Sequence, residues 1–200
     1  MEGLEVVDLR RAQRREAAIV LTNGFLEDPA WVAIGPPGEP ARRRLLRRFF
    51  RVALFETRHW GGPAWAATRD GAVVGVAVTF GAGRNFPSPL ASVLEAPLFL
   101  LAGGRTPQRA TQVGAAMARA HPRGPHLYLW FLAVDPAHQR SGVGRALMQR
   151  VLQDAAEADV PAYLETASSS NVAYYRSFGF DVTGEAPLPG RGRMWFMWRD

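Results

Sequence analysis

The most informative stretch of the chain is residues 126–150, HLYLWFLAVDPAHQRSGVGRALMQR. Leu127 to Val134 is almost wholly apolar, which predicts a central strand covered on both faces. Asp135-Pro136 ends this strand, and Gln139-Arg-Ser-Gly-Val-Gly144 predicts a sharp turn that opens a helix. Free backbone N–H groups, the positive end of the helix dipole and the guanidinium groups of Arg140 and Arg145 together predict a pyrophosphate site.

Two other phosphate-binding loops do not fit this stretch. A Walker A loop needs a lysine, and all 24 basic residues of the chain are arginine. A dinucleotide fingerprint would have a third glycine near position 147, where Leu147 stands. The structural alternative is an ordinary strand–helix turn that needs glycine for close packing.

Composition favours a soluble globular protein forming one domain, residues 1–200. Hydrophobic residues make up 48% and charged residues 21%, and the absence of cysteine excludes disulfides, thiol catalysis and cysteine-rich metal sites. The four histidines have no metal-ligand spacing, so we expect no metal. His121 and His126 flank a Pro-Arg-Gly-Pro turn and are expected to be solvated.

No run of about 18 apolar residues occurs and the N-terminus is acidic, so we expect a cytoplasmic protein that binds no membrane. We expect it to be a monomer or a homodimer.

The net charge of +6 is carried by arginine alone, and six arginines fall between Arg42 and Arg51. They alternate with Leu45, Leu46, Phe49 and Phe50, a spacing that predicts an amphipathic helix with its guanidinium groups on the polar face. A solvated helix face is the simpler interpretation. A surface that binds nucleic acid or membrane is the alternative.

The order of predicted elements indicates a mixed α/β sheet. Leu4–Leu9 predicts a strand, Ala12–Phe25 and roughly Pro40–Trp60 predict helices, and Ala64–Thr68 with Ala72–Phe80 predicts a hairpin through Asp70-Gly71. Residues 81–125 contain two helical patterns, about Ser88–Leu101 and Pro107–Ala120, which precede the apolar strand as an insertion. A helix at 142–158, a strand at Ala162–Thr166, a helix at about Asn171–Phe178 and strands near Phe180–Thr183 and Met194–Trp198 complete the order.

Two motifs together resemble the GNAT superfamily of N-acetyltransferases. The spacing Gln139-x-x-Gly142-x-Gly144 after Leu-Ala-Val-Asp-Pro resembles the acyl-CoA-binding motif of that family. Pro161–Thr166 and Asn171–Phe180 resemble its next strand and helix, which ends at Gly-Phe. Leu164-Glu-Thr166, Tyr174-Tyr-Arg176, the early Gly24–Pro29 and the terminal Met194–Arg199 resemble the puromycin N-acetyltransferase-like branch, although Arg140-Ser141 replaces the commoner Gly-Lys.

The resemblance implies a fold and a cofactor. The fold is a central, mostly antiparallel sheet flanked by helices, in which one parallel strand pair splays apart to admit acyl-pantetheine. The cofactor is acetyl-CoA as acyl donor, with no metal. The residues implied to bind it are Leu132, Ala133, Val134, Gln139, Arg140, Ser141, Gly142, Val143, Gly144, Arg145, Asn171 and Tyr175.

The resemblance and the requirements of acetyl transfer also suggest catalytic residues. A backbone N–H in Leu132–Val134 would stabilise the oxyanion, and Tyr175 would protonate the departing thiolate. Residues 127–134 contain no carboxylate, so Glu165 is the candidate base, directly or through a water. Weaker candidates for the base are Glu27, Asp28 and Glu56. The residues expected to line an acceptor pocket are Phe25, Asp28, Trp31 and Trp60.

Each of these residues also has a structural interpretation. Tyr175 could be a core tyrosine, Asn171 could cap its helix after Ser168-Ser-Ser170, and Glu165 could pair with an arginine. The expected function is acetyl transfer to a primary amine of a small molecule by direct attack in a ternary complex. The alternatives are a protein or peptide amine as acceptor, or a non-catalytic protein that senses CoA or binds nucleic acid through the 42–51 helix.

Overall fold

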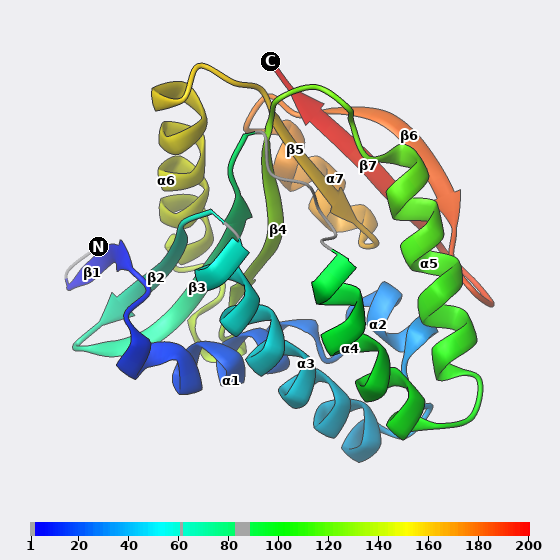
Figure 1. The fold of residues 1–200 in the computed structure, drawn as a ribbon. Helices are drawn as coiled ribbons and strands as arrows, with labels where there is room; N and C mark the ends of the chain where they lie inside the picture. Colours follow the sequence, from blue (N-terminus) through cyan, green and yellow to red (C-terminus); the bar gives the residue numbers. More distant parts are fainter. Residues whose placement is uncertain (1–2, 61, 83–88) are drawn as a thin grey trace.

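A computed structural model describes residues 3–60, 62–82 and 89–200, which form a seven-stranded mixed sheet in the order β1-β2-β3-β4-β5-β7-β6 (Figure 1). All neighbouring strands are antiparallel except β4 and β5, which run parallel. The strands are β1 (Leu4–Asp8), β2 (Ala64–Arg69), β3 (Ala72–Phe80), β4 (Leu127–Val134), β5 (Ala162–Thr166), β6 (Asp181–Pro187) and β7 (Arg193–Arg199). The expected mixed sheet with one parallel pair is confirmed.

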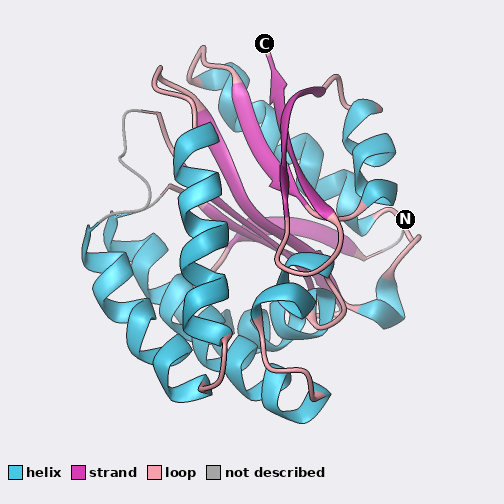
Figure 2. Cartoon of the chain, turned by 90° about the vertical axis from the view of Figure 1, so that its right-hand side faces the viewer, coloured by secondary structure: helices cyan, strands magenta, loops and turns pink. Residues whose placement is uncertain are grey.

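Helices lie on both faces of the sheet (Figures 1 and 2). One face, the α1 face, is covered by α1 (Arg14–Phe25), α2 (Pro29–Ile34), α3 (Glu39–Trp60), α4 (Pro89–Ala102) and α5 (Thr106–Ala120). The other face, the α6 face, is covered by α6 (Val143–Glu157) and α7 (Ser169–Arg176). Two 3-10 turns, η1 (Arg11–Gln13) and η2 (Pro136–His138), precede α1 and the turn into α6.

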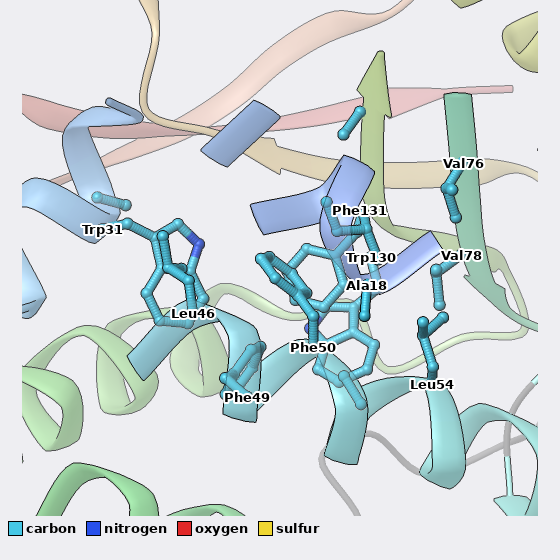
Figure 3. Packing of buried hydrophobic residues seen from close by; sticks show 14 of the residues in the cluster. Ala18, Trp31, Leu46, Phe49, Phe50, Leu54, Val76, Val78, Trp130 and Phe131 are labelled. Carbon is cyan, nitrogen blue, oxygen red and sulfur yellow. The ribbon is translucent and has the colours of Figure 1, made fainter. Parts of the chain in front are cut away.

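Local sequence accounts for most of these elements. The β2–β3 hairpin turns at Asp70 and Gly71, which have φ values of 51° and 80° and so match the two left-handed positions of a type I′ turn. α3 buries the apolar pairs that the sequence placed on one face, and its Phe49 and Phe50 pack edge-on against Phe131 of β4 (Figure 3). The predicted helices and strands are present, with ends that move by a few residues. The expected start of α4 at Ser88 lies outside the described residues.

Two expectations about polar residues were wrong. His126 is buried and His121 partly buried, because their rings pack against each other and against Tyr163 rather than projecting from the 121–126 turn. Arg42 does not lie on a solvated face: it is 5% exposed and bonds to the Leu26 carbonyl and to Glu27. Over the described ranges, no helix is long and apolar enough to cross a membrane.

Candidate functional site

The site begins where β4 and β5 stop pairing. Their parallel register runs through Leu127/Ala162 and Tyr128/Tyr163 to Leu129/Leu164, although β4 continues to Val134. At the same point the register between β3 and β4 shifts by one residue and leaves Trp130 as a bulge. A bulge bends and twists its strand, which accounts for the divergence of β4 from β5.

The bulge also changes which residues share a face. Along β4 the side chains alternate until Trp130 and Phe131, which are consecutive and both pack on the α1 face. Beyond them, Leu132 and Val134 face the α6 side. One inserted residue therefore reverses the facing pattern of the strand at the point where the gap opens.

The hydrogen-bond ladder shows which backbone groups face the gap. The Asp135 N–H donates to the Val74 carbonyl of β3 at 2.9 Å. Because successive residues of a strand point their backbone groups to opposite edges, the N–H groups of Leu132 and Val134 point towards β5. The Val134 carbonyl does the same and accepts from Gln139 Nε2 at 3.4 Å. Two donors therefore face the gap beyond the last β4–β5 pair, while the Ala133 N–H faces β3.

The turn after β4 is shaped by hydrogen bonds and by left-handed residues. Asp135 caps η2 by accepting from the Ala137 N–H at 3.1 Å, and Ser141 Oγ donates to the His138 carbonyl at 2.6 Å. Arg140 and Gly142 have φ values of 60° and 86°. Gly142 is the N-cap of α6, so no side chain caps the first turn and its N–H groups remain available to an anion.

The start of α6 lies against Tyr174 of α7. A Cβ built on Gly144 would lie 3.0 Å from Tyr174 Oη, which is closer than ordinary contact, so a larger residue here would require the tyrosine to shift. The buried Tyr174 hydroxyl has no hydrogen-bond partner among the described residues. Burial raises the pKa of Tyr174 to about 12, and the Arg145 guanidinium opposes the shift. Arg145 itself extends over the ring of Phe178, 5.5 Å from its centroid.

Glu165 directly follows Leu164, the last residue of β5 that pairs with β4, and lies on the α1 face with Tyr163. Its two carboxylate oxygens accept hydrogen bonds from Tyr128 Oη at 2.5 Å and from Tyr163 Oη at 3.1 Å. Burial raises the pKa of Glu165 to about 7, and the two tyrosine hydrogen bonds act in the opposite direction. These partners are tyrosines, so the alternative of an arginine pair is wrong.

Glu165 and its surroundings form one titratable cluster, which we define as Tyr128, Tyr163, Glu165, His121 and His126. Burial, followed by the charge of Glu165, raises the pKa of both tyrosines, so their hydroxyls remain protonated donors. The His121 ring packs edge-on against both tyrosine rings, with centroids 5.0 Å and 5.2 Å apart. Burial and then His126 lower the pKa of His121 to about 4, so it is neutral at pH 7.

Tyr175 lies on α7, on the α6 face, and is 7% exposed. Burial is the main cause of its raised pKa, and the neighbouring Tyr174 and Asp28 add to it. Asp28 comes from the α1–α2 connection and caps α2 by accepting from the Ala30 and Trp31 N–H groups. Burial raises the pKa of Asp28 to about 6 against these bonds. The structure thus brings Asp28 within electrostatic range of Tyr175.

Asn171 does not cap α7. Ser168 is the N-cap, the helix begins at Ser169, and the Asn171 N–H donates to the Ser168 carbonyl at 3.1 Å. The asparagine is exposed in the first turn. The capping interpretation of Asn171 was therefore wrong, because the chain enters the helix three residues earlier than the sequence suggested.

The expected acceptor residues are less closely grouped. Phe25 is partly buried and packs edge-on against Phe131, with the two ring centroids 5.5 Å apart. Trp31 is 7% exposed and belongs to the aromatic core, where its ring centroid lies 4.7 Å from that of Phe49 (Figure 3). Glu27 is paired with Arg42 at 2.8 Å. The side chains of Glu56 and Trp60 lie outside the described part of the structure.

The two tyrosines that donate hydrogen bonds to Glu165 are not among the site residues predicted from the sequence. Tyr163 could have been found, because residues two apart on a strand share a face. Tyr128 could not, since its position beside Glu165 depends on the β4–β5 register. The described residues include no group of three or more His, Cys, Asp or Glu side chains that could hold a metal ion.

Comparison with known proteins gives matches in sequence and in structure. The profile of the acetyltransferase (GNAT) family matches residues 36–180. Histone acetyltransferase TAP1 of Glycine max is 29% identical over 68 residues, which cover 34% of this chain and 28% of that protein. The chain therefore spans little more than a quarter of this curated relative.

Two solved structures resemble nearly the whole chain. A protein described as histone acetyltransferase HPA2 and related acetyltransferase, from Corynebacterium glutamicum, has a TM-score of 0.72 and 24% identity, with 98% of this chain and 96% of that one covered. An agmatine N-acetyltransferase has a TM-score of 0.65 and 18% identity, with 98% and 99% covered. At these identities the likeness concerns the fold.

Proposed function

Since this chain belongs to the GNAT acetyltransferase family, we propose that it transfers the acetyl group of acetyl-CoA to a primary amine of a small molecule. The amine would attack directly in a ternary complex. The observation that carries this proposal is Glu165, a buried carboxylate with a pKa of about 7 at the mouth of the β4–β5 gap. The motifs of the puromycin N-acetyltransferase-like branch support placing the chain in that branch.

The residues at the start of α6 fit the pyrophosphate of acetyl-CoA. The left-handed Gly142, the first turn without a side-chain cap and Gly144 leave backbone N–H groups open to an anion. The buried Tyr174 hydroxyl without a partner beside them is a further polar group available to the cofactor. Residues 139–145 would hold the phosphates, and the gap beyond Leu129 would take the pantetheine arm. When bound, acetyl-CoA supplies the thioester whose acyl carbon is attacked.

Glu165 would act as the general base, directly or through a water. An alkylammonium has a pKa of about 10 and is almost fully protonated at pH 7, so the enzyme must remove a proton before attack. A carboxylate with a pKa of about 7 is a far better proton acceptor at neutral pH than an ordinary glutamate. Tyr128 and Tyr163 donate to both of its oxygens and hold it at the gap.

Acetyl transfer also requires stabilisation of the oxyanion and protonation of the departing thiolate. Groups on β4 and α7 would meet these two requirements. The N–H groups of Leu132 and Val134 face the gap, where they can donate to an oxygen that gains negative charge. Tyr175, like any tyrosine whose pKa is not lowered, keeps its proton at neutral pH, and its hydroxyl would serve as the general acid for the departing thiolate. Asp28, within electrostatic range of Tyr175, would favour a cationic acceptor.

The helices over Glu165 support a small acceptor rather than a peptide. His121, directly after α5, packs on Tyr128 and Tyr163, and Glu95 of α4 affects the pKa of Tyr128. The α4–α5 pair therefore covers the α1 face beside the proposed base. A peptide acceptor would need an open groove at this position.

The test is a screen of acceptor amines that follows release of free CoA thiol. We expect thiol release with one class of small primary amine and none with Gly142→Glu as a matched control. Release with peptide amines alone would assign the runner-up acceptor. If no amine class gives release although acetyl-CoA binds, the catalytic proposal fails and the site is a CoA sensor.

A further inference from the structure

A groove between α1 and α3 is lined by arginines that the proposed reaction does not use. Its volume is about 310 Å³. The residues that line it are Ile19, Thr22 and Asn23 of α1 and Pro40, Arg43, Arg44 and Arg47 of α3. The two helices lie side by side on the α1 face (Figure 1), whereas residues 139–145 form the turn before α6 and the first residues of that helix, on the opposite face. We propose that this groove binds a phosphate monoester.

The charge of the groove is the first argument. Arg43 is paired with Glu39 at 2.9 Å, but Arg44 and Arg47 have no acidic partner in the part of the chain that the structure describes. Both are exposed and come from adjacent turns of one helix, so their like charges repel each other. Two guanidinium groups without counter-charges match a dianion, and the arginine fork matches the oxygens of a phosphoryl group.

The shape of the groove is the second argument. A volume of about 310 Å³ is more than a phosphate ion fills, and it falls at the lower end of small-ligand pockets. Ile19, 40% exposed on α1, provides an apolar surface against which the organic part of a monoester can pack. Thr22 donates its hydroxyl to the Ala18 carbonyl, so this residue offers no donor to the anion. Recognition of the phosphoryl group therefore falls to the arginines.

The groove is also connected to the turn before α6. Arg43 Nη1 donates to Asn23 Oδ1 at 3.0 Å, and Asn23 Nδ2 donates to Asp135 Oδ2 at 3.2 Å. Asp135 caps η2, which leads into residues 139–145. Arg43 is thus fixed by Glu39 and Asn23, which leaves Arg44 and Arg47 as the residues free to bind the ligand.

The experiment is a titration with inorganic phosphate followed by the backbone amide signals, repeated on Gly142→Glu, in which anion binding at residues 139–145 is blocked. We expect shifts at Ile19, Asn23, Arg44 and Arg47. The double variant Arg44→Gln/Arg47→Gln should weaken binding by about tenfold or more, because charge-assisted hydrogen bonds are lost. The matched variant Arg48→Gln/Arg51→Gln removes the same charge from the same helix outside the groove, and should change the affinity less than about twofold.

The remaining arms separate the sources of the phosphoryl group. If duplex DNA displaces phosphate from the groove, the ligand is the phosphodiester of a nucleic-acid backbone and the monoester proposal is overturned; if DNA does not displace phosphate, a free monoester is supported. The proposal is overturned if the shifts occur only at 139–145, if no shifts occur, or if both double variants weaken phosphate binding equally. It is equally overturned if DNA binds with steep salt dependence and both variants weaken it alike without phosphate entering the groove.

Discussion

The turn at residues 139–145 and the cluster around Glu165 flank the same gap but are built in opposite ways. The turn offers backbone N–H groups, and its shape depends on Gly142 and on bonds within a few residues. The cluster offers side chains from β4, β5 and the segment after α5, brought together by the sheet register. One region therefore depends on local conformation and the other on tertiary packing.

This difference separates the expected effects of mutation. A change in the turn alters how an anion is held, so we expect it to alter cofactor affinity. A change in the cluster alters the protonation of one carboxylate, so we expect it to alter the rate and its dependence on pH. The two regions are independent only if variants of each leave the other property unchanged.

We expect the largest effect from Gly142→Glu. The substitution places a side chain and a negative charge at the N-terminus of α6, where the phosphates would lie, so acetyl-CoA binding should be lost. Calorimetry with folded protein measures it. The control is Gly142→Asn, which tolerates the left-handed φ of 86° and adds no charge, and should retain much of the affinity. Wild-type affinity in Gly142→Glu would place the phosphates elsewhere.

We expect the second largest effect from Tyr175→Phe, which should lower kcat by about 10²–10⁴-fold and leave the affinity for acetyl-CoA unchanged. Only the hydroxyl that would protonate the thiolate is removed. Tyr174→Phe is the matched control, because it removes the neighbouring hydroxyl that lies against Gly144, and its kcat should remain near the wild-type value. Equal kcat values for the two variants would assign Tyr175 a packing role.

Glu165→Gln should lower the rate most at and below neutral pH, where little free amine exists. The amide keeps the shape of the side chain but cannot accept the proton. The rate should therefore recover as pH rises towards the pKa of the amine, which a pH–rate profile measures. A Glu165→Gln rate equal to wild type at pH 7 would place the base elsewhere, with Asp28 the next residue to test.

The stability of Glu165→Gln gives an independent measurement of the same carboxylate. Its folded-state pKa of about 7 lies above the usual 4.5, so the native state binds more protons than the unfolded state between these values. This group should therefore lower wild-type stability as pH rises from 4.5 to 7, by at most about 3 kcal/mol. The variant should lack that contribution. Parallel stability curves for the two proteins would show that the pKa of Glu165 is not raised.

The contrast also explains how much could be predicted from sequence. The apolar β4, the turn after Asp135 and the start of α6 follow from adjacent residues, so the element order was predictable, whereas the parallel pair was expected only from the resemblance to the family. The bulge at Trp130 was not, because an uninterrupted apolar run carries no sign of a register shift. Without it, the consecutive placement of Trp130 and Phe131 on one face could not be foreseen.

The cluster was predictable only in part. Glu165 is conspicuous as a charge within an apolar strand, but its partner Tyr128 stands 37 residues earlier and reaches it only through the β4–β5 register. His121 follows a predicted helix and precedes the Pro-Arg-Gly-Pro turn, both typical of solvated residues, yet His126 is buried and His121 is partly buried because both rings pack against Tyr163. Tertiary contacts decided these positions.

The smallest effect we expect is from Tyr163→Phe, which tests whether the cluster sets the pKa of Glu165. The 3.1 Å hydrogen bond from Tyr163 favours the ionised carboxylate, so its removal should raise the Glu165 pKa above about 7. Because the base must be ionised, the acidic limb of the pH–rate profile should move to higher pH, by about one unit, the equivalent of a single hydrogen bond to a charged group. Acetyl-CoA affinity should not change, since residues 139–145 share no bond with Tyr163. A changed acetyl-CoA affinity together with an acidic limb at the wild-type pH would contradict the division between the two regions. It would show that the cluster acts through the shape of the gap and not through the protonation of Glu165.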